Sequence, residues 1–284
     1  MTQPYELTAS EARKLIGQKK ISSVELLKSC LDRIEKVNPI INAIVAIDQS
    51  VAIENAKQAD KKTLNGEELN LLHGLPVGIK DLCMVKNLRS TSGSLINENH
   101  IPNEDDEIVK KIRNEGGIIF CKTNTPEFGA GGNTTNKVYG TTVNPFDIKK
   151  SAAGSSGGSA AALACDMLPL ANGSDYGGSL RTPSGFCGVS GFRPSPGIVP
   201  TVDSSICLNP FSVQGPMGKN VIDTFLLLQA QADINCNDPF SSFNSLSLPE
   251  SLNESDLSSI KMAYSSDLGC APVDKNIEKT FLDK

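Results

Sequence analysis

A long stretch rich in glycine, serine, threonine and asparagine, residues 123–200, occupies the middle of this 284-residue chain. A polar segment of this length inside a compact domain is usually either a linker or a functional site. Two short apolar runs, Ala160–Ala164 and Phe186–Val189, interrupt it, and this argues against a linker. The stretch therefore predicts site-forming loops, supported by regular elements from the rest of the chain.

The first 65 residues predict helices, because their apolar residues recur at helical spacing. Ser22 and Glu25 have the spacing of a capping box that opens the second helix, and Asn38-Pro39 is expected to end it. After these helices the pattern changes to short apolar runs separated by glycine and proline. The runs that predict strands are residues 75–80, 117–121 and 260–264, and of these 117–121 is expected to be buried. Strands that alternate with a helix over residues 105–115 predict an α/β core.

Composition excludes several classes of protein. The chain has 27 basic and 32 acidic residues, a net charge of −5, which argues against direct binding of nucleic acid through a broad basic surface. No run reaches the roughly 18 apolar residues of a membrane span, and the first residues do not form a signal peptide, so we expect a cytoplasmic protein. The eight cysteines contain no CxxC, and His73 and His100 are the only histidines, so a metal site is poorly supplied.

Two clusters of serine and glycine carry the strongest chemical signal. The first serine cluster is Gly154–Ser159, and the second is Ser174–Arg181. Glycine pairs beside a serine allow several backbone N–H groups to point at one spot, which is how an oxyanion hole is built. A single such cluster is more often a flexible turn, but two clusters separated by an alanine-rich helix favour a site.

The base that would activate a serine is not a histidine. Ser156 stands at the centre of a formal GxSxG, but that nucleophile elbow needs a histidine after the serine, and both histidines precede it. No glycine-lysine-serine/threonine follows either cluster, which excludes a phosphate-binding loop. Lys80 is the candidate base, because desolvation at the end of a buried strand favours its neutral amine. Considered alone, a lysine at a strand end is more often a solvated surface charge.

Five further stretches form an ordered pattern that chance does not produce. They are Gly74–Asp81, Lys122–Phe128, Tyr139–Phe146, Phe186–Pro194 and Gly215–Met217. With these motifs the chain resembles the amidase signature family, which includes bacterial amidases, fatty-acid amide hydrolases and the glutamine-hydrolysing component of the tRNA-dependent amidotransferase. The resemblance covers nearly the whole chain and implies a mixed twisted β-sheet covered by α-helices on both faces.

The resemblance also implies a Ser–Ser–Lys triad. Ser179 matches the nucleophile, Ser155 matches a bridging serine held by a cis peptide bond, and Lys80 matches the base. In this arrangement Ser155 relays a proton between the other two groups. The remaining matches are Tyr176, Gly177 and Gly178 as the oxyanion hole, and Ser156, Asp175 and Arg181 as support for the loops. Local structural hydrogen bonding alone would equally account for the three supporting residues.

The expected activity is hydrolysis of a small-molecule carboxylic amide to an acid plus ammonia or an amine, through an acyl-enzyme on Ser179, without a metal or cofactor. The alternatives are the glutamine-hydrolysing component of a tRNA-dependent amidotransferase and an inactive fragment. Tyr176 replaces a threonine frequent in the family, and its ring is expected to narrow the pocket. Thr182 replaces the glutamine of the amidotransferase component, and this second departure favours a stand-alone amidase. A homodimer is the expected assembly.

The expected organisation is one amidase domain over residues 1–284. Its parts are N-terminal helices 1–65, a catalytic core 66–240 and the start of a C-terminal part 241–284. Family chains continue well past this length, so we expect a C-terminal part to be missing. Because the absent strands would cover a sheet edge, the 284-residue chain by itself is expected to be poorly soluble and to have little amidase activity.

Overall fold

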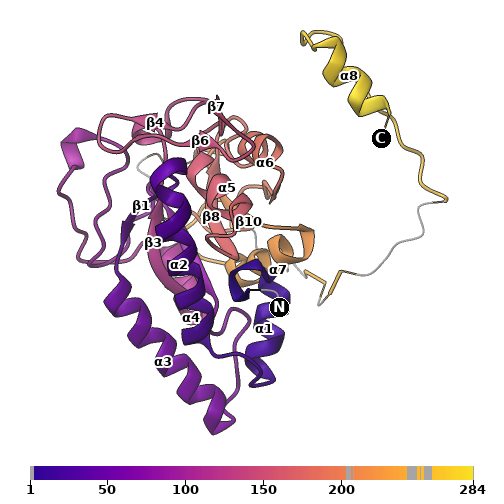
Figure 1. Cartoon of the computed structure of the whole chain (residues 1–284). Helices are drawn as coiled ribbons and strands as arrows, with labels where there is room; N and C mark the ends of the chain where they lie inside the picture. Colours follow the sequence, from indigo (N-terminus) through magenta and orange to yellow (C-terminus); the bar gives the residue numbers. More distant parts are fainter. Residues whose placement is uncertain are drawn as a thin grey trace. The chain divides into compact units, whose positions relative to one another are not determined.

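The computed structural model describes residues 3–202, 206, 208–241, 248–249, 251–252 and 258–283 (Figure 1). The chain divides into two units, Met1–Leu248 and Pro249–Lys284. The first unit contains the sheet and both serine clusters. The second contains helix α8 (Lys275–Leu282), and in it the rings of Tyr264 and Phe281 lie 5.8 Å apart between centroids.

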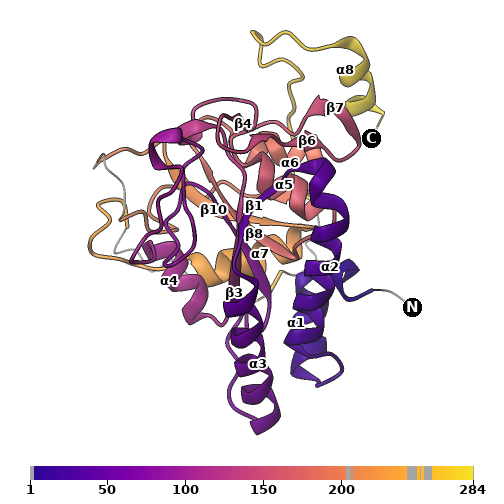
Figure 2. The same ribbon diagram turned by 60° about the vertical axis from the view of Figure 1, so that its left-hand side comes forward.

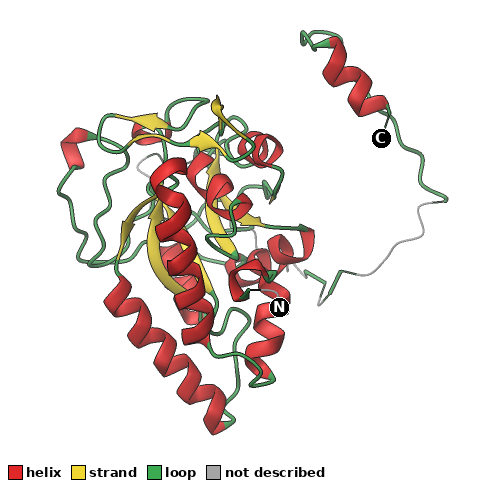
Figure 3. Ribbon diagram, viewed as in Figure 1, coloured by secondary structure: helices red, strands yellow, loops and turns green. Residues whose placement is uncertain are grey.

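A six-stranded sheet forms the centre of the first unit, with the strand order β1-β3-β2-β8-β10-β9 (Figure 3). The strands are β1 (Ile44–Ile47), β2 (Pro76–Lys80), β3 (Ile118–Thr123), β8 (Leu170–Asp175), β9 (Ser190–Gly191) and β10 (Val213–Gly218). Strand β2 pairs in parallel with both β3 and β8, whereas β1, β10 and β9 pair antiparallel with their neighbours. The mixed sheet confirms the predicted fold class.

The parallel centre of the sheet decides where the site lies. Strands β2, β3 and β8 run in one direction, so their carboxyl ends, at Lys80, Thr123 and Asp175, share one edge of the sheet. Every residue of β2 and β3 is buried, which matches their short, nearly continuous apolar runs. Lys80 therefore ends a strand from which water is excluded.

Helices cover both faces of this sheet, as expected. Helices α4 (Glu107–Asn114) and α7 (Val221–Gln231) pack on one face, and α5 (Gly157–Ala164) packs on the other. Figure 2 shows α4 and α5 on opposite sides of the strands. The remaining helices of this unit are α1 (Ala9–Gly17), α2 (Ser23–Ile41), α3 (Gln49–Asn65) and α6 (Arg181–Cys187).

Each face of the sheet has its own hydrophobic cluster. One includes Leu27, Phe120 and Leu163, and the other includes Ile79 and Ile112. Full burial of such a side chain contributes about 1.5–3 kcal/mol, so the two clusters hold the strand ends in place. Short elements complete the unit: η1 (Pro4–Glu6), η2 (Leu95–Asn97), η3 (Glu127–Gly129), β4 (Thr135–Asn136), β5 (Gly140–Thr141), β6 (Val143–Asn144) and β7 (Asp147–Ser151).

The capping box at the start of α2 is confirmed. The Glu25 N–H donates to Ser22 Oγ at 3.0 Å, and the Ser22 N–H donates to the Glu25 carboxylate at 2.7 Å. The expected end of this helix at Asn38-Pro39 is wrong, because Pro39 lies inside the last turn and the helix continues to Ile41. Pro39 has no N–H to donate to the Glu35 carbonyl oxygen, and the helix continues for only two more residues before the left-handed Asn42 (φ 54°) ends it.

The strand expected over residues 260–264 is also wrong. The structure describes this segment without strand pairing. Ile260, Met262 and Tyr264 are all exposed. An apolar run forms a strand only where a neighbouring strand satisfies its backbone, and this run has no such neighbour among the described residues.

Candidate active site

The two serine clusters lie side by side at the carboxyl edge of the parallel strands. The first serine cluster leads into α5, and the peptide bond between Gly154 and Ser155 is cis, as the resemblance implied. The second begins in the last two residues of β8 and leads into α6. The Ser156 N–H donates to the Ser179 carbonyl oxygen at 3.3 Å and so joins the two loops directly.

The Lys80 side chain is fully buried and ends among serine hydroxyls. Its Nζ lies 2.7 Å from Ser155 Oγ, 2.8 Å from Ser156 Oγ and 3.0 Å from Ser174 Oγ. Burial lowers the pKa of Lys80 to about 7, although Cys83 and Asp175 act in the opposite direction. A substantial share of this amine is therefore neutral near pH 7, which a general base requires.

Strand β8 positions two side chains against Lys80. Asn172 and Ser174 are two residues apart on this strand, so their side chains share a face. The Lys80 backbone N–H donates to Asn172 Oδ1 at 2.7 Å, while Ser174 contacts the amine at the far end of the side chain. Both ends of the lysine are thus held by one neighbouring strand.

Ser179 is half-buried and lines a cavity of about 590 Å³. Ser155 and Ser174 line the same cavity, so two of the serines that contact Lys80 share its wall with the predicted nucleophile. The shared cavity and the joined loops thus bring Lys80, Ser155 and Ser179 to one place, with the lysine behind the serines.

The loop between β8 and α6 turns at the glycine pair Gly177-Gly178. Gly178 has φ +116°, in the left-handed region, and a Cβ there would lie 2.8 Å from Thr182 Oγ1. The Gly178 N–H donates to Asp175 Oδ1 at 2.8 Å. Of the predicted oxyanion-hole residues, Gly178 thus uses its N–H within the loop, and Tyr176 and Gly177 remain candidate donors on the cavity wall.

The Asp175 carboxylate organises the loop that carries Ser179. It accepts hydrogen bonds from the Leu180 N–H at 3.1 Å, from Arg181 at 3.0 and 3.1 Å, and from Arg193 at 2.9 Å. Burial alone would raise the pKa of this carboxyl. The hydrogen bonds from Arg181, Gly178 and Leu180 outweigh burial, so the pKa lies well below its ordinary value. Asp175 is therefore a stable anion that ties two arginines to the nucleophile loop.

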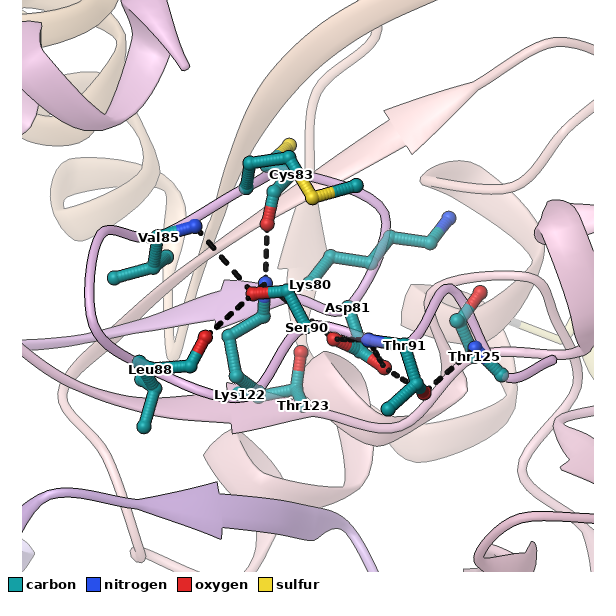
Figure 4. A network of polar contacts seen from close by, with 12 residues as sticks. Lys80, Asp81, Cys83, Val85, Leu88, Ser90, Thr91, Lys122, Thr123 and Thr125 are labelled. Carbon is teal, nitrogen blue, oxygen red and sulfur yellow. Dashed lines mark hydrogen bonds and ion pairs between the residues drawn. The ribbon is translucent and has the colours of Figure 1, made fainter. Parts of the chain in front are cut away.

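A second buried lysine lies close to the site but belongs to a different network (Figure 4). Lys122 Nζ lies 3.4 Å from Asp81 Oδ1, donates to Ser90 Oγ at 3.0 Å and contacts the Cys83 carbonyl oxygen. Asp81 also accepts the Thr91 hydroxyl at 2.7 Å. Burial lowers the pKa of Lys122, while Asp81 acts against that shift. This network fixes the loop that follows Lys80.

Several of these residues have no role that the sequence alone predicts. Arg193 and Lys122 lie inside motifs that carried the family resemblance, but only the folded chain shows what they contact. Ser174 was part of the second serine cluster. It lies two residues after Asn172, and alternate residues of a strand share a face, so this spacing could have predicted that both side chains contact Lys80.

Three negative findings apply to the described part of the chain. No three His, Cys, Asp or Glu side chains gather there to hold a metal ion. None of the helices described is both long and apolar enough to cross a membrane. The seven cysteines that the structure describes are all free, and five of them are buried.

The fold and the site define an α/β protein with a buried lysine aimed at paired serines beside a cavity. Comparison with known proteins identifies the family to which the chain belongs. The model of the family described as Amidase matches residues 25–284, so the chain belongs to the amidase signature family.

Similar proteins carry more than one name. One relative, from Thermoanaerobacter pseudethanolicus, is the glutamyl-tRNA(Gln) amidotransferase component designated A, which is 41% identical over 224 residues, covering 79% of this chain and 46% of that protein. The chain is 35% identical over 277 residues to an acylamidase of Rhodococcus erythropolis, covering 98% of this chain and 58% of the relative. The chain therefore spans about half the length of the curated relatives that it matches.

A solved structure supports the same fold. A bacterial aryl acylamidase of the amidase signature family superposes with a TM-score of 0.79 at 32% identity, covering 83% of this chain and 49% of that one.

Proposed function

We propose that this chain hydrolyses a carboxylic amide through an acyl-enzyme on Ser179. The observation that carries the proposal is the 2.7 Å contact between Lys80 Nζ and Ser155 Oγ, at a cavity whose wall also includes Ser179. Burial supplies the second requirement, because it lowers the pKa of Lys80 to about 7 and favours the neutral amine. The chain spans about half of its relatives, so the activity of a longer protein is part of the same proposal.

The reaction proceeds in two halves. Ser179 Oγ attacks the amide carbonyl carbon while its proton passes to Ser155 Oγ, and the Ser155 proton passes to Lys80 Nζ. The C–N bond then breaks, and the protonated Lys80 returns the proton through Ser155 to the departing nitrogen. Water attacks the ester carbonyl carbon and gives a proton through Ser155 to Lys80. The bond to Ser179 Oγ then breaks, and Lys80 returns the proton through Ser155 to Ser179 Oγ, which releases the acid and restores Ser179.

Backbone N–H groups stabilise the negative charge that develops on the carbonyl oxygen. Tyr176 and Gly177 lie on the cavity wall three and two residues before Ser179, and the anchored Asp175 holds their loop. Each preorganised donor contributes roughly 3–4 kcal/mol to the transition state in known hydrolases. Ser156, Asp175 and Arg181 act as loop supports in this proposal.

The second candidate is the glutamine-hydrolysing component of a tRNA-dependent amidotransferase. Its support is the 41% identity to a relative of that name. Thr182 on the cavity wall, where that component has glutamine, favours the stand-alone amidase. A cytoplasmic location, a homodimer and a single amidase domain over 1–284 remain predictions.

The test is ammonia release from a panel of amides, using the 284-residue chain without partner proteins. We expect only slow turnover of simple amides by this chain on its own, complete loss of that turnover in Ser179→Ala and no change in Ser50→Ala, an exposed serine on α3. Glutamine hydrolysis that requires the other amidotransferase components would favour the second candidate instead. Turnover that survives in Ser179→Ala would contradict the assigned nucleophile.

A further inference from the structure

Two aromatic side chains from separate loops line the cavity beside Ser155 and Ser179. Tyr176 is 63% exposed and immediately precedes Gly177-Gly178-Ser179, and Phe128 is 55% exposed in η3. Large apolar rings exposed inside a cavity remain available to a ligand, which is the usual composition of a small-molecule site. Neither residue has a part in the proton relay.

Contacts within the protein hold the Tyr176 ring and the Phe128 backbone in place. The Tyr176 ring lies 5.7 Å from that of Phe211 between centroids, at 46° between planes, a favourable tilted arrangement of two aromatic rings. Phe128 has a left-handed backbone (φ 50°, ψ 22°), and its N–H donates to the Ser92 carbonyl at 2.8 Å. A Cβ on the neighbouring Gly129 would lie 2.7 Å from Leu82, so this segment packs closely against the wall.

Charge is absent from the cavity wall as described. None of the described residues that line it is Asp, Glu, Lys, Arg or His. The nearby charged group, Asp175, is buried and already paired with Arg181 and Arg193. A substrate group with its own charge would lose hydration on this wall without gaining a partner, which is costly.

We infer that the cavity binds an uncharged aromatic amide, with its aryl group packed against Tyr176 and Phe128 while its carbonyl faces Ser179. The inference rests on the proposed function and adds the substrate class to it. It assigns Tyr176 and Phe128 as specificity-determining residues. A flat ring gains contact area and favourable ring geometry on these side chains, which an aliphatic group of equal size gains only in part. Glutamine, with two charged groups, is disfavoured.

The kinetic test compares four amides on the 284-residue chain: benzamide, acetanilide, cyclohexanecarboxamide and glutamine. Benzamide and acetanilide place the ring on the acyl and amine sides respectively, and cyclohexanecarboxamide matches benzamide in size without a flat ring. We expect an aryl amide to have the highest kcat/KM and glutamine the lowest. Tyr176→Ala is expected to lower the aryl preference roughly tenfold, and Tyr176→Phe to retain it. Phe186→Ala, an equally exposed aromatic residue outside the cavity lining, is the matched control and should change nothing.

A binding measurement separates this inference from the proposed function. In the Ser179→Ala background, saturation-transfer NMR should detect benzamide more strongly than cyclohexanecarboxamide, and the further change Tyr176→Ala should remove the difference. This binding result, together with an absence of amide turnover by the chain that retains Ser179, would support the aromatic site and contradict the hydrolase. Turnover that ranks all four amides equally, with no effect of Tyr176→Ala on turnover or binding, would overturn the inference and leave the hydrolase standing.

Discussion

Lys80 Nζ lies 3.0 Å from Ser174 Oγ, and this contact completes a set of three hydroxyls around one buried amine. A neutral amine has two N–H donors and one lone pair. The Ser156 hydroxyl donates to the Ser174 carbonyl oxygen at 3.2 Å, so Ser156 accepts from Lys80. With Ser174 as the second acceptor, the lone pair faces the Ser155 hydroxyl, which is the direction that the proposed relay needs.

The pH dependence of turnover should report the Lys80 amine. Burial lowers its pKa to about 7, so the protonated, inactive form dominates below that pH and the neutral base dominates above it. We expect kcat/KM to rise with pH through about 7 and then to level off. The profile is measured with one neutral amide between about pH 5.5 and 9, and an unchanged rate across this interval would argue against Lys80 as the base.

Removal of the Ser174 hydroxyl should change both the rate and that profile. Ser174→Ala takes away an acceptor that stabilises the charged lysine, so the acid limb should move to lower pH. The rate on the plateau should fall, because the lone pair is no longer directed at Ser155. Ser174→Thr keeps the hydroxyl and should restore the limb, whereas a fall in rate with an unmoved limb would indicate a merely structural role.

The anion of Asp175 should stabilise the fold in a pH-dependent way. Its folded pKa lies below the unfolded value, so its contribution is fully present above about pH 4 and declines as the pH falls further. Asp175→Asn should lower the free energy of unfolding by about 3–5 kcal/mol at neutral pH, since Arg193 loses its carboxylate partner. Urea titrations at about pH 7 and about pH 3.5 check this, and the difference between the two proteins should be smaller at the acidic pH.

Arg181 and Arg193 should contribute unequally to that anion. Arg181 is largely exposed, whereas Arg193 is mostly buried and also bonds the Phe211 carbonyl at 3.0 Å. Arg193→Met should therefore destabilise the protein more than Arg181→Met, as measured by urea unfolding. Equal losses in the two variants would contradict this reading of the contacts.

The Lys122–Asp81 pair offers a test of the loop that follows Lys80. Asp81→Asn leaves a buried lysine without its carboxylate and should cost about 3–5 kcal/mol of folding free energy. The double variant Asp81→Asn/Lys122→Met removes the unpaired charge and should recover part of the loss. Thermal unfolding of the natural chain and these variants checks the order, and a double variant less stable than Asp81→Asn would show that the two residues do not act as a pair.

The general fold could be predicted because periodicity and burial agreed along most of the first unit. Strand β2 ends at Lys80 as its apolar run indicated, and the capping box at Ser22 opens α2. The predicted end of α2 at Pro39 was wrong, because a local pattern does not report how far a helix continues past a proline. The predicted strand over residues 260–264 was wrong, because a local pattern does not report whether a partner strand is present. The contacts of Ser174 and Arg193 required strand register and loop closure over long sequence separations.

The most direct test of the proposed relay is the position of a fluorophosphonate label on the 284-residue chain. Trypsin releases Ser155, Ser156 and Ser179 in one peptide, residues 151–181, so a further chymotryptic cut after Tyr176 is needed to isolate Ser179. We predict that the label is found on the Ser179 fragment, that it is lost in Ser179→Ala and that its formation is strongly slowed in Lys80→Ala. A label on the Ser156 fragment, or one that persists in Ser179→Ala, would contradict the Ser179–Ser155–Lys80 relay.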